Sequence, residues 1–435
     1  MLLLGPARDG RHLMASSENV VRLGFTGVGS RGQQLMRRCV EMDDVVIPAV
    51  CDLQKRHLDT VTELIEESGG DAPATYEDHA MMLEREELDG VIIASSWSLH
   101  IPMAIQAMEA GVRPGLEVGP ASSIQECWDL VRTAERTGTD CMLLENACFG
   151  RDRMAVLNMV RDGLFGELLH AQCGYLHDIR PEIHGERPTR MAERDGMGYR
   201  TLHFLHRNAD VYPTHGVGPV AKYLDVNRGN RFLSLTATAT KSKGLERWAR
   251  EHRDEDAPTR GLDWAIGDVV TTVIKCSRGE SIIIKHDCSS PRPRSYMMTV
   301  QGTAGVWEKD SERIYFEGES PHHEWEPFED YHTKYEHSLW QTYDEQGVKG
   351  GHGGTDYLVM RSFVRSIADG VRFPIDVYDT AAWMAISPLS EDSIATGSSP
   401  VTFPDFTNGR WLTDREIFGL TDDVPADILD FETLL

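Results

Sequence analysis

The sequence lacks the features that mark several large classes of protein. Its eight cysteines include no Cys-x-x-Cys pair, and its histidines have no carboxylates or thiols at metal-ligand spacing, so we expect buried, reduced thiols and no bound metal. Lys and Arg number 44 against 69 Asp and Glu, and no dense basic stripe interrupts the acidic excess. A formal net charge of −25 disfavours nucleic acid or an anionic membrane as a partner. No apolar run is long enough to span a bilayer.

The first residues also lack a secretory signal, because their apolar run is short and charge follows it. We therefore expect a cytoplasmic protein whose partner is a small molecule. Met14 begins a segment that looks like an alternative start, so residues 1–18 are expected to form a disordered leader. A length of 435 residues exceeds what one hydrophobic core normally supports, which predicts two domains.

The most informative segment that is present is residues 21–32, where an apolar strand runs directly into Gly27-x-Gly29-x-x-Gly32. In a dinucleotide-binding turn the first glycine permits the bend, the second lets the backbone approach a pyrophosphate, and the third lets the helix pack on its strand. The helix N-terminus then offers unpaired N–H groups to the phosphates. Ser30 and Arg31 lie in this turn, which predicts a cofactor site there.

Asp52 follows the second predicted strand, residues 45–51, and lies 20 positions beyond Gly32. A carboxylate at this point accepts hydrogen bonds from both ribose hydroxyls, which favours NAD over NADP. Lys55 and Arg56 follow closely and weaken that preference. The predicted cofactor is NAD.

Apolar runs alternate with helical patterns as far as residue 145, which is typical of a doubly wound parallel α/β sheet. Residues 91–94 and 141–144 are apolar without alternation, as expected for parallel strands covered on both faces. We predict an NAD-binding Rossmann domain over residues 19–148. Its helices are expected at residues 33–39, 55–67, 76–83, 102–110 and 125–135.

After a helix at residues 153–161 the pattern changes to consecutive strands with few helices between them. This predicts an α+β substrate-binding domain with a largely antiparallel sheet over residues 149–435. Its helices from Gly353 onward are expected to pack back on the N-terminal domain. A loop predicted at residues 178–212 carries Tyr199, Arg200, His203 and Arg207, which favours a functional role. The strands are expected at residues 168–175, 232–240, 269–276, 281–286 and 296–301.

His215 is the favoured acid–base candidate, because it lies among glycines and prolines in residues 212–219 and an imidazole titrates near neutrality. Capping of the following helix is the alternative role. Tyr175, at the end of a predicted strand, is ambiguous by itself, since a strand tyrosine more often belongs to a core.

Long and particular motifs cover residues 144–148, 158–168, 174–181, 212–219, 225–231, 351–357 and 404–409. With them the chain resembles the superfamily of glucose-fructose oxidoreductases and inositol dehydrogenases, from about residue 21 to residue 411. Within that superfamily it most closely resembles the NAD-dependent α-N-acetylgalactosaminidases of glycoside hydrolase family 109. The resemblance also implies a homo-oligomer that pairs through its antiparallel sheets.

The resemblance implies an unusual hydrolysis. Tightly bound NAD oxidises the C3 hydroxyl of the sugar, which acidifies the C2 hydrogen; the C1 substituent is then eliminated, water adds, and C3 is reduced again. A ketone beside C2 lets a base of modest strength remove that proton, so the carboxylate pair of ordinary glycosidases is unnecessary. No net redox change occurs.

Carried over residue by residue, the family's catalytic groups fall on Tyr175, as the base at C2, and His215, as the acid–base group at the C3 hydroxyl. The reverse assignment fits the sequence equally well. The resemblance implies that further groups position the sugar: Glu145, Arg200 and Tyr212. Loops on the nicotinamide side match Ser95, Trp97, His100, Glu117 and Val118, for which loop packing is the alternative.

Departures from the relatives sharpen these expectations. Val118 and Pro219 stand where simple dehydrogenases of the superfamily carry a lysine and an aspartate, which weighs against a plain sugar or cyclitol dehydrogenase. Arg294 stands where the glycosidases have a substrate-contacting tyrosine, although Tyr296 lies two positions on, and Phe149 replaces another tyrosine. A guanidinium in a sugar pocket favours an acidic substituent.

We predict a glycoside hydrolase that acts on α-N-acetylgalactosaminides or a related glycoside, including acidic ones. An NAD-dependent sugar or cyclitol dehydrogenase is the alternative enzyme, and a non-catalytic sugar-sensing protein is the alternative without chemistry.

Overall fold

The computed structural model describes residues 20–185, 198–346 and 351–413. The leader predicted for residues 1–18 lies outside the described residues. Within them no helix is both long and apolar enough to cross a membrane. All eight cysteines are described, and each is buried and unpaired, as expected.

The N-terminal part is a six-stranded parallel sheet in the order β3-β2-β1-β4-β5-β6, which confirms the predicted Rossmann fold. Strand β4 is buried along its whole length, and α2 buries Leu58, Val61, Leu64 and Ile65 on one face, as the apolar pattern predicts. The elements are β1 (Val21–Thr26), α1 (Ser30–Cys39), β2 (Val45–Cys51), α2 (Lys55–Glu67), β3 (Ala74–Tyr76), α3 (His79–Arg85), β4 (Gly90–Ile93), α4 (Trp97–Glu109), β5 (Arg113–Leu116), α5 (Ile124–Thr137) and β6 (Met142–Leu143).

Three helices of this part begin three or more residues away from their predicted starts, and the first of them, α1, begins at Ser30 and not at residue 33. Tyr76 ends β3, and α3 begins only at His79, because the Asp78 carboxylate caps it by accepting a hydrogen bond from the Met81 N–H. Helix α4 begins at Trp97, earlier than predicted, with Pro102 inside it. Trp97 and His100 therefore lie on a helix and not in a loop.

The C-terminal part is built on a nine-stranded sheet in the order β14-β13-β12-β11-β7-β10-β9-β8-β15. Every neighbouring pair is antiparallel except β7 and β10, so the prediction of a largely antiparallel sheet is confirmed. Its strands are β7 (Leu168–Leu176), β8 (Phe232–Ala239), β9 (Val270–Cys276), β10 (Ser281–Asp287), β11 (Thr299–Gly302), β12 (Gly305–Glu308), β13 (Arg313–Phe316), β14 (Glu326–Pro327) and β15 (Val401–Thr402).

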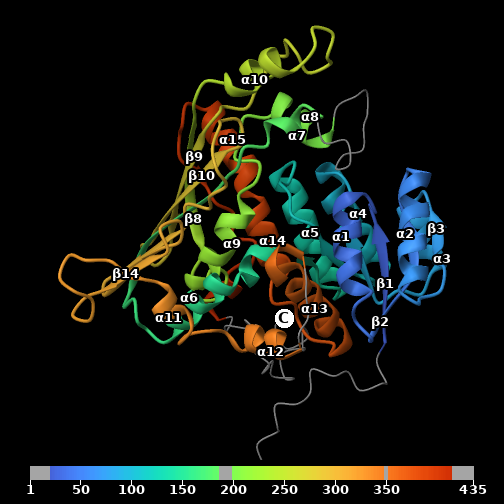
Figure 1. Ribbon diagram of the computed structural model, residues 1–435, viewed down its shortest axis with the longest axis horizontal. Helices are drawn as coiled ribbons and strands as arrows, with labels where there is room; N and C mark the ends of the chain where they lie inside the picture. The colour runs from blue at the N-terminus through green and yellow to red at the C-terminus, as the bar shows by residue number, and fades with distance from the viewer. Residues whose placement is uncertain (1–19, 186–197, 347–350, 414–435) are drawn as a thin grey trace, which may run out of the picture.

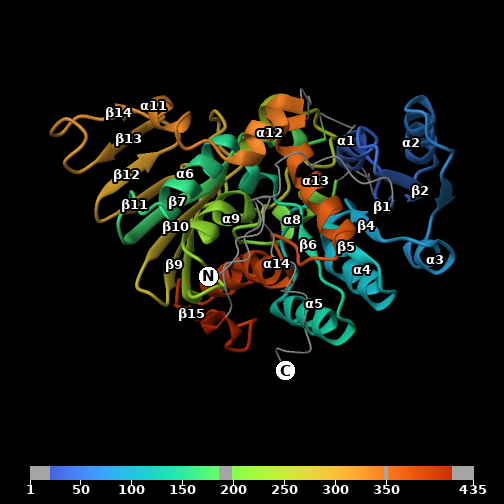
Figure 2. The ribbon, with the colours of Figure 1, turned by 90° about the horizontal axis from the view of Figure 1, so that it is seen from below.

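Helices fill the space between the two sheets, as Figures 1 and 2 show for α6, α9 and α14. The opposite face of the nine-stranded sheet is bare in both views, and β9 accordingly alternates between buried and more exposed residues such as Val273. Pairing of this face in a homo-oligomer stays a prediction. The helices of this part are η1 (Asn146–Phe149), α6 (Arg151–Arg161), α7 (Arg180–Ile183), α8 (Tyr199–His206), α9 (Thr214–Tyr223), α10 (Gly244–His252), α11 (Glu329–His332), α12 (Ser338–Gln346), η3 (Gly351–Gly354), α13 (Thr355–Ala368), α14 (Val377–Met384), α15 (Ile386–Ala395) and η4 (Arg410–Leu412).

The loop predicted at residues 178–212 is wrong in part, because it contains α7 and α8. Pro181 lies in the first turn of α7, where its missing N–H costs nothing. Helix α8 buries Thr201 and Phe204, three positions apart, a repeat too short to stand out as a helical period. The two helices bring Glu182, Tyr199 and Arg200 to the pocket described below.

The C-terminal segment packs against the N-terminal sheet. The Arg113 guanidinium donates hydrogen bonds to the backbone oxygens of Ser366 and Val371 at 2.7 Å each. Arg361 of α13 donates to Asp44 at 2.6 Å. In Figure 2, α13 lies beside α1 and β1. The chain thus returns from the second sheet to cover the first, and this return shapes one wall of the site.

Candidate active site

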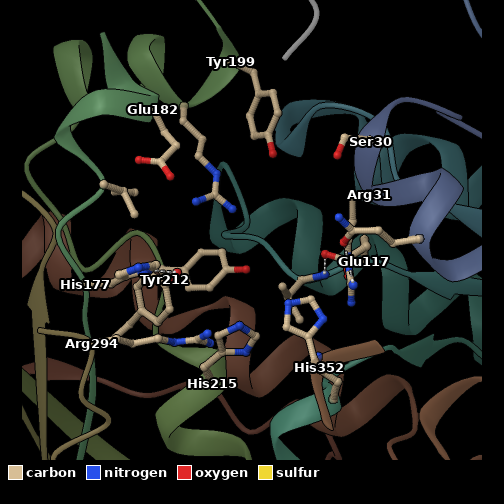
Figure 3. A pocket seen from close by; sticks show the side chains of 16 residues that line it. Ser30, Arg31, Glu117, His177, Glu182, Tyr199, Tyr212, His215, Arg294 and His352 are labelled. Carbon is tan, nitrogen blue, oxygen red and sulfur yellow. Dashed lines mark hydrogen bonds and ion pairs between the residues drawn. The ribbon is translucent and has the colours of Figure 1, made fainter. Parts of the chain in front are cut away.

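One pocket brings residues of both parts of the chain together (Figure 3). Ser30 and Arg31 line one side, while His177 and Arg294 line the other. The pocket is open to solvent, and its empty space including the open mouth is about 930 Å³. Other predicted residues that line it are Glu117, Val118, Tyr175, Arg200, Tyr212 and His215.

The dinucleotide-binding turn has the geometry that a pyrophosphate needs. Gly27 has φ +80°, and a Cβ atom there would lie 2.6 Å from the backbone of Ala94, so only glycine fits. A Cβ atom on Gly32 would lie 2.1 Å from the Gly27 oxygen. At Gly29, by contrast, the nearest atom would be His57 Cε1 at 3.6 Å, and α1 begins there without a side-chain cap. The N–H groups of its first turn are thus left for an anionic ligand.

Asp52 lies beside this turn at the end of β2. Its Oδ2 accepts a hydrogen bond from the Val28 N–H at 2.9 Å, and its Oδ1 accepts from the Gln54 N–H at 2.8 Å and lies 3.2 Å from His57 Nδ1. Oδ2 therefore retains a lone pair for a ribose hydroxyl. Lys55 is paired with Asp59, and the Arg56 guanidinium donates to the Gln54 side chain at 2.7 Å. The Asp52 carboxylate at the ribose position is the feature that favours NAD, and of the two cations only Lys55 is paired with a carboxylate.

A charge cluster ties the C-terminal segment to the first turn of α1; we call it the Arg31 clamp, formed by Arg31, Glu117, Asp356, His352 and Asn146. The Arg31 guanidinium donates to Glu117 at 2.6 Å and to both oxygens of Asp356 at 2.8 and 3.0 Å. Asp356 also accepts from Asn146 at 2.8 Å and bonds to His352 Nδ1 at 2.6 Å. Although burial opposes ionisation, the bonds from His352 and Arg31 hold the pKa of Asp356 well below its usual range.

His215 and Glu145 form a hydrogen-bonded pair under the pocket. Glu145 is fully buried, and its carboxylate oxygen lies 2.6 Å from His215 Nδ1 and accepts from the Ala147 N–H at 3.0 Å. Burial alone would raise the pKa of Glu145, but His215 offsets this and brings the pKa below its usual value. An ionised carboxylate fixes the imidazole with a proton on Nδ1, which leaves Nε2 as a proton acceptor.

Tyr175 and His177 form a second pair on the neighbouring strand end. The Tyr175 hydroxyl lies 3.0 Å from His177 Nδ1. Burial raises the pKa of Tyr175 to about 12, against the opposing effect of Arg200 and Arg294. Burial, and after it the charge of Arg294, lowers the pKa of His177. Both shifts favour a neutral resting pair, in which His177 Nδ1 can accept a hydrogen bond from the phenol; the charges of Arg200 and Arg294, by contrast, favour the phenolate that a base role requires.

Aromatic rings surround the two arginines of this side. The Arg200 guanidinium lies 5.0 Å from the centroid of Trp97 and 5.2 Å from that of Tyr212. Arg294 lies 5.1 Å from the ring centroid of Tyr296 and donates a hydrogen bond to its hydroxyl. Both arrangements leave guanidinium N–H groups for a ligand.

Some predicted site residues do not line the pocket. Trp97 is buried against Tyr199, His203 and Tyr212, and His100 is buried with Nε2 3.0 Å from the Ser95 backbone oxygen. Direct contacts of Ser95, Trp97 and His100 with a cofactor, and of Glu145 with a sugar, stay predictions. Phe149 is fully buried and also lies outside the lining.

The sequence analysis assigns no role to several residues in or beside the pocket. His177, Asn146 and His352 line the pocket, and Asp356 bonds to Asn146 and His352. All four lie inside the motifs that carry the family resemblance, and this signal could have identified them. Glu182 lies outside these motifs, and helix α7 brings it to the pocket. Among the residues that the structure describes, no group of three or more His, Cys, Asp or Glu side chains is placed to hold a metal ion.

Comparison with known families identifies both parts. Residues 149–413 match the family described as "Glycosyl hydrolase 109, C-terminal domain". Residues 21–144 match "Oxidoreductase family, NAD-binding Rossmann fold".

Two bacterial proteins are similar along nearly the whole chain. An alpha-N-acetylgalactosaminidase of Tannerella forsythia is 44% identical over 423 residues, which cover 93% of this chain and 90% of that protein. A glycosyl hydrolase family 109 protein of Parabacteroides distasonis is 43% identical over 420 residues, with 92% and 90% covered.

Solved structures share the fold at much lower identity. An inositol dehydrogenase homolog from Azotobacter vinelandii, complexed with NAD⁺, superimposes with a TM-score of 0.62 at 14% identity and covers 89% of this chain and 98% of its own. At such identity the likeness extends to the fold alone.

Proposed function

Since the chain belongs to glycosyl hydrolase family 109 and has an NAD-binding Rossmann domain, we propose that it hydrolyses a glycosidic bond by transient oxidation of the sugar with NAD that stays bound. The observation that carries this proposal is the composition of one pocket. Residues of the dinucleotide-binding turn and two pairs of proton-carrying side chains line or adjoin the same space. An ordinary glycosidase needs a pair of carboxylates at the scissile bond. Of the residues that the structure describes, two carboxylates line this pocket, Glu117 and Glu182, and Glu117 is held by Arg31.

When bound, NAD supplies the redox chemistry, since it withdraws the C3 hydrogen with its electron pair and returns it later in the turnover. His215 is suited to the proton of the C3 hydroxyl. Its Nε2 is free to accept that proton, and the buried Glu145 carboxylate stabilises the imidazolium that results. His215 returns the proton when C3 is reduced again, so the group ends the turnover as it began.

Tyr175 and His177 are suited to the C2 proton. Once C3 is a ketone, the C2 hydrogen is acidic enough for a phenolate. The charges of Arg200 and Arg294 favour that phenolate against burial, and neutral His177 is the acceptor within reach of the phenol proton. Loss of the C2 proton expels the C1 substituent as the C1–O bond breaks. Water then adds across the resulting double bond, with its oxygen at C1 and a proton returned to C2 by the same pair.

The Arg31 clamp supports retention of the cofactor between turnovers. Arg31 lies in the first turn of α1, and its bonds to Asp356 fasten the C-terminal segment to that turn. His352, next to Asp356 in this link, lines the pocket. A segment tied across the site slows the departure of a dinucleotide, and a retained cofactor is what a cycle without net redox change requires.

The substrate class follows from the relatives. The similar protein of Tannerella forsythia carries the name alpha-N-acetylgalactosaminidase, so α-N-acetylgalactosaminides are the first candidates. Tyr212 and Arg200 offer the ring face and hydrogen-bond donors that sugar binding uses. Related glycosides remain within the proposal, because the chain has an arginine at Arg294.

The test uses the purified protein without added cofactor and a panel of α- and β-linked p-nitrophenyl glycosides in deuterated water. Nitrophenolate and NADH absorbance are followed together, and the released sugar is analysed for deuterium at C2. We expect nitrophenolate without accumulation of NADH, and deuterium at C2, because the C2 proton is exchanged with solvent in each turnover. Chromatography of the denatured protein should release NAD.

Other outcomes contradict the proposal in distinct ways. Nitrophenolate without deuterium at C2 would indicate direct displacement at C1. Steady NADH formation from free sugars after addition of NAD would instead indicate a dehydrogenase. Sugar binding with neither product would indicate a sugar-sensing protein.

A further inference from the structure

The segment between β10 and β11 carries two arginines with different partners. Arg292 donates to the Asp287 carboxylate at 3.2 Å. Arg294, two residues later, lines the pocket and has no carboxylate partner among the residues that the structure describes; its guanidinium bonds only to the Tyr296 hydroxyl. One arginine therefore fixes the segment, and the other presents its charge to the pocket.

Lack of acidic residues does not explain the missing partner, because the chain has 69 Asp and Glu against 44 Lys and Arg. Arginines of the two helices that reach the pocket bond to carboxylates: Arg180 of α7 donates to Asp178 at 2.7 Å, and Arg207 at the end of α8 donates to Glu391 at 2.9 Å. Arg200 is half-buried and lines the same pocket; it lies against the rings of Trp97 and Tyr212 and likewise has no carboxylate partner within the described chain. Two guanidiniums without carboxylates in an acidic protein mark a place where a ligand brings the negative charge.

The surroundings of Arg294 fix where that charge must be. Its guanidinium lies 6.0 Å from the Tyr175 ring centroid, and the hydrogen bond to Tyr296 holds its head group. Figure 3 shows it beside His177 and His215, across the pocket from Ser30 and Arg31. The charged group of the ligand is therefore carried on the side of the sugar that faces away from the cofactor turn.

The carboxylates of the pocket do not occupy Arg294. Glu117 is bound to Arg31 and accepts from the Val118 N–H at 2.9 Å. Glu182 lies on α7, which Figure 3 shows beyond His177 and away from Arg294. Neither one neutralises the guanidinium in place of a ligand.

We propose that Arg294 makes this enzyme selective for glycosides that carry an anionic substituent, either the carboxylate of a uronic acid or a sulfate ester. A guanidinium presents a planar fork of N–H donors that matches two oxygens of such a group, whereas a neutral hydroxyl accepts only one bond and brings no charge. The hydrogen bond to Tyr296 reduces the side-chain entropy lost on binding. This inference rests on the proposed hydrolysis for its kinetic test but not for its binding test.

The kinetic test compares three p-nitrophenyl glycosides of one configuration: the neutral sugar, its uronide and its sulfate ester. The quantity measured is selectivity, the ratio of kcat/KM for a charged substrate to that for the neutral one. We expect the wild type to prefer at least one charged substrate by about 10-fold or more, and Arg294→Gln to lower this ratio by about 10- to 100-fold. Arg294→Lys should lose less, since it retains the charge without the fork.

Arg292→Gln is the matched control, because it removes the same kind of side chain from the same segment outside the pocket lining. It should leave the ratio within about threefold of the wild type. Any general effect of Arg294→Gln on Tyr175 or His177 alters both substrates alike and cancels in the ratio. A preference for the neutral glycoside, or a ratio that does not change in Arg294→Gln, would overturn the proposal.

The binding test needs no turnover. The melting temperature of the NAD-loaded protein is measured with a free uronic acid, a sulfated sugar and the neutral sugar. A larger shift with a charged sugar, lost in Arg294→Gln and kept in Arg292→Gln, supports the anion site even if no glycoside is hydrolysed. Hydrolysis of neutral glycosides without any dependence on Arg294 leaves the proposed function standing and removes the anion site; no binding and no hydrolysis removes both.

Discussion

The two walls of the pocket treat their charges in opposite ways. On the cofactor wall, formed by the dinucleotide-binding turn and the Arg31 clamp, Arg31 is neutralised by Glu117 and Asp356. On the substrate wall, formed by Tyr175, His177, Arg200, Tyr212, His215 and Arg294, the two arginines lie against rings with no carboxylate partner in the described chain. A charge that is already paired acts as scaffold, whereas spare donors and lone pairs remain available to a ligand. The cofactor wall therefore serves to position the bound cofactor, whereas the substrate wall keeps groups free to bind and react with the sugar.

The largest effect should come from the substrate wall. Removing the hydroxyl in Tyr175→Phe is expected to lower kcat/KM by about 1,000-fold, because the proposal assigns the C2 proton to this hydroxyl. The NAD content and the melting temperature should stay close to those of the wild type, since the cofactor wall is untouched. Turnover of a p-nitrophenyl glycoside, chromatography of bound NAD and thermal unfolding measure these three quantities.

A single-turnover experiment with Tyr175→Phe and His215→Asn determines which of the two residues serves C2 and which serves C3. If His215 serves C3 and Tyr175 serves C2, Tyr175→Phe still reduces bound NAD when substrate is added but releases no leaving group. His215→Asn then does neither. NADH absorbance in His215→Asn together with its absence in Tyr175→Phe would reverse the assignment.

The cofactor wall could largely be predicted from the sequence, because its signals lie within short segments of the chain. The glycines Gly27, Gly29 and Gly32 mark a tight turn after a strand, and Asp52 follows the next strand; this local pattern predicts the turn and the acid. Tyr175 and His215 were found by resemblance. Their partnership with His177 and Glu145 depends on distances that only folding sets.

The contacts of the Arg31 clamp could not be predicted from the sequence. Arg31 and Asp356 are 325 positions apart, and their contact depends on how α13 returns to α1. Neither residue has a local pattern that names its partner. Helices α7 and α8 were missed for a related reason, because four and eight residues are too few to establish a period.

The second prediction concerns the carboxylate behind His215. Glu145→Gln keeps the shape of the side chain and a hydrogen-bond acceptor but removes the negative charge that stabilises protonated His215. We expect kcat/KM to fall by about 100-fold, with little loss of stability because the variant buries no charge. Glu109→Gln, which opens an exposed ion pair with Arg136, is the control and should retain full activity. Equal activity of the two variants would show that the charge of Glu145 has no part in proton transfer.

The third prediction tests the cofactor wall. Asp356→Asn removes one of the two carboxylates from Arg31, and we expect the free energy of unfolding to drop by about 2 kcal/mol, since Asp356 is buried while Arg31 keeps Glu117. NAD should dissociate about 10-fold faster, measured by its loss during repeated gel filtration. Asp59→Asn, the same substitution in an exposed pair with Lys55, should change neither quantity. Unchanged retention of NAD in Asp356→Asn would separate the clamp from cofactor binding.

The smallest expected effect is on the pH dependence of activity, through the charge of Arg294 on His177. Burial is the larger cause of the lowered pKa of His177, and the charge of Arg294 is the second. His177 accepts the Tyr175 proton only when it is neutral, so activity is present above the pKa of His177 and is lost as the pH falls through it.

Arg294→Gln removes a positive neighbour of His177 and raises the pKa of His177. The acid limb of kcat/KM for the neutral glycoside should therefore move to higher pH. The shift should be small, because the Arg294 side chain is exposed and solvent screens its charge. Glu182 and Asp178 act on His177 in the opposite sense and are unchanged in the variant, as is Arg200, while Arg292→Gln should leave the limb in place. If the acid limb of the pH profile stays in place or moves to lower pH in Arg294→Gln, the titrating group is not His177. The catalytic role of the substrate wall would then depend on Tyr175 and His215 alone.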